Sequence, residues 1–374
     1  MKRNILQTTL GVCVASLLLI GSTASAEEGS SWADSIKLGG DLRFRHERID
    51  QDGKVVRTRQ RIRARLSLSA EVDEDFDVHM RLASGSDDPV STNSTLGSGF
   101  STKDFGLDLA YFDWNIEKSD FHLMAGKMKQ PFYVVKDLIY DSDLNPEGGA
   151  LQYDFDLGGT GSLIATAAGW WGEERSSDSD TMMWGGQLLA DLDIAESAAL
   201  ETGVSYYYWD NTKGFDPLFD SGDSFGNSTM TDLSGMTVYA NDFGIINPFA
   251  KLKIDVGMPL AVYADVAINT QEDTAGEDTA WMVGATLGKA KEVGSWQADY
   301  NYRNVEADSI IGAFTDSDSG GGGTDISGHR VQFQYQIKDR ITASATLFVN
   351  ELGIASGATS TDYNRIQIDL IAKL

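Results

Sequence analysis

The amino-acid sequence predicts an all-β protein, a transmembrane antiparallel β-barrel of about 16 strands with long external loops. Arginine occupies every second position from Arg57 to Arg65, and the alternate positions continue as Ile62, Ala64 and Leu66. Successive side chains of a strand point to opposite faces, so this stretch carries charge on one face and hydrocarbon on the other. A barrel wall with lipid outside and water inside favours such a strand.

The first residues indicate export. A basic start is followed by an apolar run over residues 10–20 and by small residues at 24–26, the pattern of a cleaved signal peptide. The alternative, a retained single-span anchor, would need about 20 apolar residues. No later stretch approaches about 18 uninterrupted apolar residues, which leaves a soluble exported protein or a membrane barrel. The expected organisation is a signal peptide over 1–26, a short periplasmic N-terminal segment over 27–35 and the barrel over 36–374.

Composition favours the barrel. The chain is 41% hydrophobic, yet its mean hydropathy is −0.24, as expected for strands that alternate apolar and polar residues. The formal net charge of −26 excludes nucleic-acid binding through a basic surface. The single cysteine, Cys13, lies in the predicted signal peptide. The mature chain is therefore expected to have no disulfide, no catalytic thiol and no cysteine-ligated metal.

Segments in which apolar and polar residues alternate recur along the whole chain, and each is predicted to be a strand. Their number is even, as single-chain bacterial barrels require, and tight connections alternate with long ones. Short periplasmic turns and long external loops produce that alternation. In chain order the predicted strands are 36–48, 56–71, 76–84, 105–117, 121–130, 148–157, 162–171, 181–193, 197–210, 245–256, 260–270, 279–291, 294–305, 328–338, 340–350 and 362–374.

The later strands show both faces. In 328–338, Val331 and Phe333 alternate with Gln332 and Gln334, and in 362–374 the apolar face runs to Leu374. The alternative is a soluble β-protein whose aromatic residues form an ordinary core. The sequence has no layer pattern that would bury sixteen one-sided strands, so the barrel is preferred.

Arginine facing lipid at the membrane midplane costs about 2–4 kcal/mol, so the arginines of the first strands are predicted to face water. The first three strands are neighbours, and their cations are expected to form one basic wall along the lumen. Arg365 and Lys373 on the last strand would widen it, because that strand pairs with the first to close the barrel. The predicted pore-lining basic wall is Arg43, Arg45, Arg57, Arg59, Arg61, Arg63, Arg65 and Arg81.

An acidic segment follows the fifth strand. Residues 130–149 are too apolar for a free external loop, so this third loop is predicted to fold inward and place its acids opposite the basic wall. Charges across a narrow aqueous gap set the field and the ion selectivity of a pore. The glycine run 320–323 is expected to be the flexible tip of an external loop. The predicted constriction-loop acids are Asp137, Asp141, Asp143 and Glu147.

The export signal, the arginine-rich strand and the segment GKMKQPFYVVKDLIYDSDLNPEGG at 126–149 resemble Gram-negative outer-membrane porins of the "putative porin" group. The recognisable motif covers residues 105–150, and the layout covers nearly the whole mature chain. The resemblance implies a 16-stranded barrel, usually trimeric, that passes small hydrophilic solutes and ions. Its partners would be outer-membrane lipid and those solutes, and the expected location is the outer membrane.

Other functions stay open. A channel selective for anionic nutrients differs from a general pore only in width and in the order of its polar groups. A barrel hydrolase would need a nucleophile, a base and an orienting group, and no G-x-S-x-G or H-E-x-x-H motif occurs. The histidines available to it are His46, His79, His122 and His329.

No cofactor and no enzymatic activity are expected. A weak calcium candidate remains in the oxygen donors Asp141, Asp143, Asn145 and Glu147. Their spacing is like the start of a calcium loop, but Pro146 replaces the expected glycine and Gln152 the closing glutamate.

Overall fold

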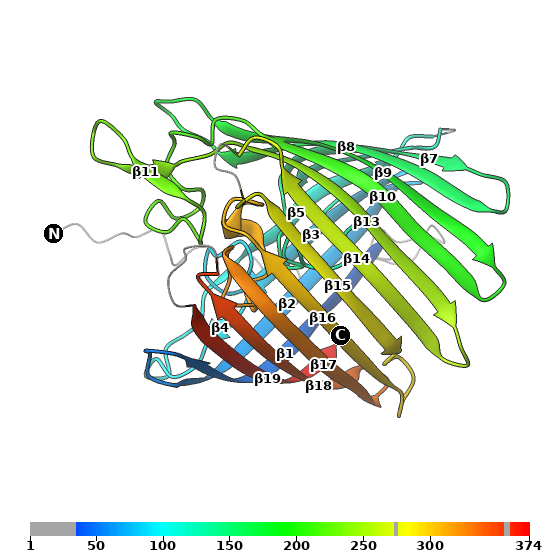
Figure 1. Cartoon of the computed structure of the whole chain (residues 1–374). Helices are drawn as coiled ribbons and strands as arrows, with labels where there is room; N and C mark the ends of the chain where they lie inside the picture. The colour runs from blue at the N-terminus through cyan, green and yellow to red at the C-terminus, as the bar shows by residue number, and fades with distance from the viewer. Residues whose placement is uncertain (1–34, 118, 273–275, 355–359) are drawn as a thin grey trace, which may run out of the picture. The chain divides into compact units, whose positions relative to one another are not determined.

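The computed structural model describes residues 35–117, 119–272, 276–354 and 360–374, so the predicted signal peptide lies outside the described residues. Within them, sixteen strands form one closed antiparallel sheet (Figure 1), and the predicted fold class is confirmed. These strands are β1 (Ile36–Gln51), β2 (Arg57–Asp73), β3 (Phe76–Ser84), β5 (Phe105–Asn115), β6 (Phe121–Lys127), β7 (Glu147–Asp156), β8 (Gly161–Glu173), β9 (Thr181–Ala195), β10 (Ala198–Trp209), β13 (Phe243–Asp255), β14 (Pro259–Asn269), β15 (Thr279–Gly288), β16 (Trp296–Val305), β17 (Ile326–Lys338), β18 (Ile341–Leu352) and β19 (Thr361–Lys373).

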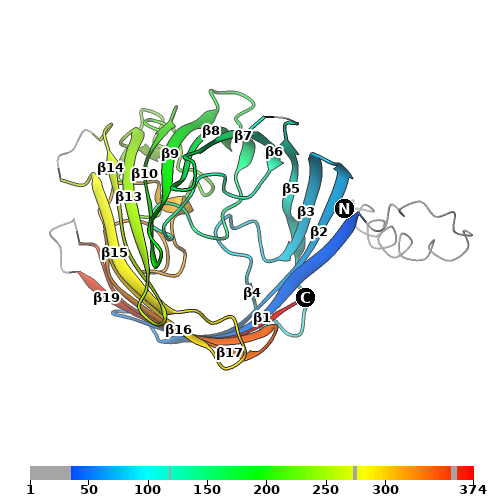
Figure 2. The same ribbon diagram turned by 90° about the vertical axis from the view of Figure 1, so that its right-hand side faces the viewer.

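The sheet closes because the first and last strands pair. β1 and β19 run antiparallel, with Phe44 opposite Leu370 and Arg45 opposite Asp369. Closure leaves no unpaired edge, which a sheet in lipid requires. Figure 2 shows the strands arranged around a central lumen. Short elements lie in the connections: β4 (Ser94–Thr95), β11 (Thr229–Thr231), β12 (Thr237–Tyr239) and the 3-10 helix η1 (Gly312–Phe314).

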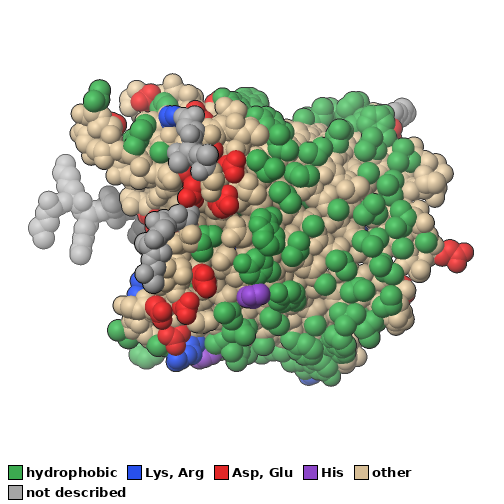
Figure 3. Space-filling model, viewed as in Figure 1, with side chains coloured by type: hydrophobic (Ala, Val, Ile, Leu, Met, Phe, Trp, Pro, Cys, Tyr) green, Lys and Arg blue, Asp and Glu red, His purple; other side chains and the backbone are tan. Residues whose placement is uncertain are grey.

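The polarity of the wall is the reverse of that of a soluble protein. On β19, Arg365 and Gln367 are each 2% exposed, whereas Ile368 between Gln367 and Asp369 is 51% exposed. Figure 3 shows hydrophobic side chains spread over the outside of the strands, with acidic side chains gathered over the long loops. Such a surface suits hydrocarbon around the barrel and water at its ends. Within the residues that the structure describes, no helix is long and apolar enough to cross a membrane.

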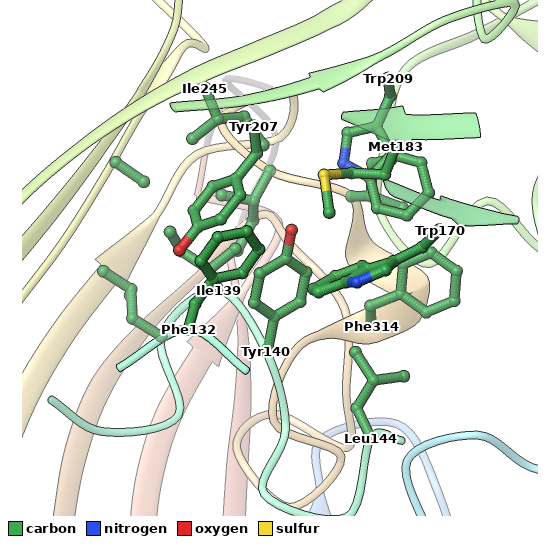
Figure 4. Packing of buried hydrophobic residues seen from close by; sticks show 14 of the residues in the cluster. Phe132, Ile139, Tyr140, Leu144, Trp170, Met183, Tyr207, Trp209, Ile245 and Phe314 are labelled. Carbon is green, nitrogen blue, oxygen red and sulfur yellow. The ribbon is translucent and has the colours of Figure 1, made fainter. Parts of the chain in front are cut away.

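The loop between β6 and β7, residues 128–146, enters the lumen. The wall strand ends at Lys127, earlier than predicted. The Met128 N–H still donates to the Pro146 carbonyl at 2.9 Å, but proline has no N–H to return the bond, so the ladder stops there. Two of its aromatic side chains pack on the inner side of the wall. Phe132 lies 5.2 Å from Tyr207 of β10 and Tyr140 lies 5.5 Å from Trp170 of β8, measured between ring centroids (Figure 4).

The loop between β16 and β17, residues 306–325, also folds inward. Ile310 and Ser319 are fully buried, so the prediction that Gly320–Gly323 form the tip of an external loop is wrong. All four glycines have positive φ angles of 62 to 101°, a conformation that allows the chain to fold back sharply. The Gly320 N–H donates to the Asn350 side chain of β18 at 3.1 Å. An Asp- and Gly-rich composition here marks a tight inward turn.

Candidate functional site

Arg45 of β1 illustrates how the lumen holds its cations. Asp369, its cross-strand neighbour on β19, accepts two hydrogen bonds at 2.7 and 2.9 Å, and Asp318 of the β16–β17 loop accepts one at 3.1 Å. A guanidinium has five donors in a planar fork, so the paired contact fixes its direction. Arg45 is 5% exposed and its charge is neutralised. It ties the loop to the wall.

A second network crosses the closure of the barrel. Glu47 of β1 is fully buried and forms ion pairs with Arg59 of β2 and Arg365 of β19. Arg365 also lies 2.6 Å from Asp318. The three strands that meet at the closure are therefore linked by charge inside the lumen as well as by their backbone ladder.

The β6–β7 loop touches the predicted basic wall directly. Arg63 and Arg65 of β2 both pair with Asp41 of β1, at 2.9 and 2.6 Å. Asp143 of the loop lies 3.7 Å from Arg63 and 3.3 Å from Arg65. The acid is thus an ion-pair partner of these arginines, with no open gap between them.

Two predicted site residues lie apart from this cluster. Arg57, at the external end of β2, is exposed. Glu147 is the first residue of β7, where its side chain is 62% exposed and pairs with Lys127 at 2.7 Å. Arg81 of β3, by contrast, pairs with Asp108 of β5 and donates to Asn145 of the loop at 3.3 Å.

Asp137 points to a different part of the wall. Its carboxylate accepts from Arg303 of β16 at 2.6 Å, and the same guanidinium donates to Asp316 at 2.9 Å. Burial alone would raise the pKa of Asp137, but the charges of Arg303, Arg330 and Lys136 together outweigh it and hold that pKa below its usual value. Lys136 beside it pairs with Asp299 of β16 at 3.1 Å.

The sequence predictions did not place Arg303 and Asp316 in the site. The alternation of β16 puts Arg303 on the polar face, which is the signal that marks it as lumen-facing. Asp316 belongs to an acidic run that composition alone assigns to solvent. Its burial depends on the inward fold of the β16–β17 loop, which no short pattern specifies.

Asp141 joins the two inward loops. Its carboxylate accepts the backbone N–H of Asp143 at 2.7 Å and of Ser317 at 2.9 Å, and its own N–H donates to the Phe314 carbonyl at 2.8 Å. Burial raises the pKa of Asp141 well above its usual value, and the nearby carboxylates of Asp316 and Asp143 raise it further. The two backbone hydrogen bonds that Asp141 accepts act in the opposite direction, and they tie the two loops together.

A cavity of about 190 Å³ lies among these groups. Arg43, Arg63 and Asp143 line it on one side, and Gln334 of β17 and Ser344 of β18 contribute neutral polar groups. The arrangement can hold water and hydrogen-bond a small polar solute. The two remaining arginines, Arg43 and Arg61, contact Asn93.

The calcium candidates do not share one direction. Asp143 faces Arg65, Asn145 accepts from Arg81, and Glu147 pairs with Lys127. Among the residues that the structure describes, no group of three or more histidine, cysteine or acidic side chains is arranged to hold a metal ion.

One family model matches most of the chain. The profile of the family described as "Putative porin" matches residues 50–240 and 248–374. A search of curated protein sequences gave no match.

Solved structures show the same fold. OprB of Pseudomonas putida at high pH is 9% identical, with 97% of both chains covered and a TM-score of 0.60. The Salmonella typhi OmpF complex with daunomycin is 10% identical, covering 92% of this chain and 99% of that one, with a TM-score of 0.53. The channel DcaP of Acinetobacter baumannii is 13% identical, covering 91% and 97%, with a TM-score of 0.51. At these identities the likeness extends to the fold.

Proposed function

This chain belongs to the putative porin family, and from that premise we propose that it forms a passive, water-filled channel for small hydrophilic solutes and ions in the outer membrane. The distribution of polarity around the closed sheet carries the proposal. Apolar side chains such as Ile368 and Leu370 are exposed on the outside, and charged and amide side chains such as Arg365 and Gln367 face inward. Outward apolar and inward polar rows are what a conducting barrel in lipid requires.

The two inward loops support a constriction as part of this proposal. The β6–β7 loop is fixed to the wall by ion pairs at two points, Asp137 with Arg303 near its middle and Asp143 with Arg65 near its end. The β16–β17 loop is fixed by Asp318 to Arg45 and Arg365. Charged groups arranged along a narrow passage set ion preference through their local field. Solutes would pass beside these loops.

Two further features belong to the proposal. We propose a homotrimer, because OmpT of Vibrio cholerae, a structure with the same fold, is described as a trimer form. That protein is 13% identical to this chain, the match covers 91% of this chain and 99% of OmpT, and the TM-score is 0.50. We also propose export through a signal peptide cleaved after residue 26, on the sequence pattern alone. Light scattering of the purified protein in detergent measures the oligomeric state, and N-terminal sequencing of the mature protein identifies the cleavage site.

We propose no catalytic role for the serine, histidine and aspartate set formed by Ser69, His79 and Asp113. Ser69 Oγ and His79 Nδ1 lie 2.9 Å apart. His79 Nε2, however, is 3.7 Å from Asp113, beyond hydrogen-bond distance, so no third group fixes the ring through a hydrogen bond. The family and the fold are those of channels, and the proposed transport couples to no reaction.

Recordings of the purified protein in planar lipid bilayers test the channel. We expect stepwise increases in conductance as single barrels insert, with a current proportional to voltage near zero. Heat-unfolded protein at the same detergent concentration is the control, since detergent alone can also perturb a bilayer. Absence of steps from folded protein would overturn the proposal.

A further inference from the structure

The charges inside the barrel are almost all paired. Arg45, Arg59 and Arg65 each have a carboxylate partner from another strand or from an inward loop. Arg303 and Arg330, on the wall farther along, pair with Asp137 and Asp299. These guanidinium groups hold the wall and loops together, and their donors are largely occupied. A passing solute competes with fixed carboxylates for them.

Arg43 of β1 and Arg61 of β2 are exceptions within the part of the wall that faces the inward loops. Among the described residues, neither forms an ion pair with a carboxylate. Arg43 Nη2 donates to Asn93 Oδ1 at 2.5 Å, and Arg61 Nη2 donates to the Asn93 carbonyl at 3.3 Å and to Ser91 Oγ at 3.4 Å. The Nε atom of each guanidinium is buried without a hydrogen-bond partner. Two full positive charges therefore meet at one neutral residue.

Their surroundings favour an anion. Arg43 is 9% exposed and lies beside Arg45 and Arg63, and a buried unpaired charge of this kind is costly. The nearest carboxylates are engaged elsewhere, since Asp369 and Asp318 both contact Arg45. An arriving oxyanion would supply the missing partner, and the planar fork of arginine matches a carboxylate or phosphate group.

One member of the pair, Arg43, also lines a cavity, whereas Arg61 contacts the lining residue Asn93 without lining the cavity itself. Arg43 and Asn93 line the cavity of about 190 Å³ between the inward loops and the wall. Gln332, Gln334 and Ser344 line the same cavity from β17 and β18, so neutral polar groups could accept the rest of the solute. Six aspartates line this cavity. Those at 137, 143, 316, 318 and 369 are each held by an arginine, and Asp141 accepts the backbone N–H groups of Asp143 and Ser317.

We propose that Arg43 and Arg61, brought together at Asn93, form an oxyanion-binding subsite in the constriction, which takes one carboxylate or phosphate group of a small solute as it passes. The inference rests on the proposed channel function. It makes anionic solutes the preferred cargo although the whole chain has a net charge of −26. Local unpaired cations, and not the net charge, decide which ion enters the narrow zone.

Single-channel recordings test the subsite with two probes, succinate and inorganic phosphate, added to potassium chloride. We expect both to reduce the current in a concentration-dependent way. Arg43→Gln and Arg61→Gln should each raise the half-blocking concentration about tenfold, the effect of losing one charge-assisted contact. Both variants should also shift the reversal potential in a salt gradient towards cations. Block by only one of the probes would assign the subsite to that anion class.

Two further variants make the test independent of folding. Asn93→Asp has nearly the same shape and supplies the missing carboxylate, so it should abolish the block while the barrel stays folded. Arg57→Gln removes an exposed arginine of the same strand and should leave the block unchanged. Unaltered block in Arg43→Gln, Arg61→Gln and Asn93→Asp would overturn the subsite, as would an equal loss in Arg57→Gln. If the subsite fails this test while the unaltered protein still gives conductance steps, the proposed channel function stands. If the unaltered protein gives no conductance steps, the channel function itself is overturned.

Discussion

At the scale of single residues, Glu47 is the carboxylate shared by two arginines of the lumen. Its carboxylate is fully buried and holds Arg59 and Arg365 together across the closure of the barrel. Glu47→Gln would leave two guanidinium groups without that partner. We expect the free energy of unfolding to fall by about 3 kcal/mol, the lower end for a broken buried ion pair, because water in the lumen hydrates part of the freed charge.

Denaturant unfolding in detergent, followed by tryptophan fluorescence, measures this change. Glu71→Gln is the matched control, since its side chain is 56% exposed and lies 4.0 Å from Lys37. An exposed pair of this kind contributes about 0–1 kcal/mol. Equal effects of the two substitutions would show that burial does not strengthen the Glu47 pairs.

The alternation of side chains along a strand was enough to predict which face each of these residues occupies, but not which residues they contact. Alternation assigns Arg45 to the polar face, and the structure buries it inside the barrel. Its partner Asp369 depends on the register between the first and last strands, which alternation alone leaves free by steps of two residues. Its other partner, Asp318, arrives on a loop whose path depends on the packed lumen. Long-range pairing therefore had to come from the structure.

At the scale of elements, the β6–β7 loop is held by packing as well as by charge. Leu138 is fully buried in the aromatic cluster that includes Phe132 and Trp170, while Val134 of the same loop is 39% exposed. Leu138→Ala should weaken the seating of the loop by about 2–4 kcal/mol, the cost of a cavity in a packed core. We expect noisier and larger single-channel currents, because the loop then leaves its place more often.

Val134→Ala is the control for the loop and should leave the current trace unchanged. The strand ladder does not depend on Leu138, so both variants should keep the same far-ultraviolet circular dichroism. If Leu138→Ala conducts with the same noise and amplitude as Val134→Ala, the loop does not limit the current.

The junction of the two inward loops should respond to pH through Asp141. Burial, together with Asp316 and Asp143, raises the pKa of Asp141 in the folded state, so the folded chain keeps a proton that the unfolded chain releases near pH 4. The contribution of Asp141 to stability is therefore lost as pH rises above about 4. Asp141→Asn removes that loss, so its melting temperature relative to the unaltered protein should rise with pH between about 4 and 8.

For Asp137→Asn we expect the opposite dependence of the melting temperature on pH. Arg303, Arg330 and Lys136 together hold the pKa of Asp137 below its usual value, so the ionised carboxylate stabilises the fold at neutral pH, and this contribution disappears on acidification. The melting temperature of Asp137→Asn should fall further below that of the unaltered protein as pH rises from about 2 to about 4 and should keep that deficit at higher pH. Differential scanning calorimetry at several pH values gives both trends. Parallel trends in the two variants would contradict this assignment of charge.

The strands themselves were predictable from the sequence, and the inward loops only in part. Every barrel strand has a period-two pattern several residues long, and lipid on one side makes that pattern strict. The β6–β7 loop could be assigned to the lumen because residues such as Leu138 and Tyr140 are too apolar for solvent. The β16–β17 loop has few such residues around its glycine run, and Ser319 is buried by the shape of the lumen, so composition indicated the wrong environment.

At the scale of the whole molecule, one physical rule organises the wall. Its outward side chains are largely apolar, and its inward side chains are polar except where an inward loop packs on apolar residues such as Trp170 and Tyr207. The rule holds where the barrel closes, since Leu370 of β19 is exposed beside Phe44 of β1, while Asp369 and Arg45 face inward as a pair. A soluble sandwich would bury the apolar row. The same sequence can therefore be stable only with hydrocarbon around it, and this makes the orientation of each face testable.

Ile368→Arg places a charge on the outer face near the middle of β19, where the side chain is 51% exposed. Near the membrane midplane this should cost about 2–4 kcal/mol and lower the yield of folded barrel in lipid vesicles. Gln334→Arg places the same charge on β17, where position 334 lines the cavity, and should fold with nearly unchanged yield because water solvates the new guanidinium. Folding yields in vesicles, and not in detergent alone, provide the comparison. A loss at position 334 equal to that at 368 would mean that the interior is as dry as the exterior, and the pore would have no aqueous path.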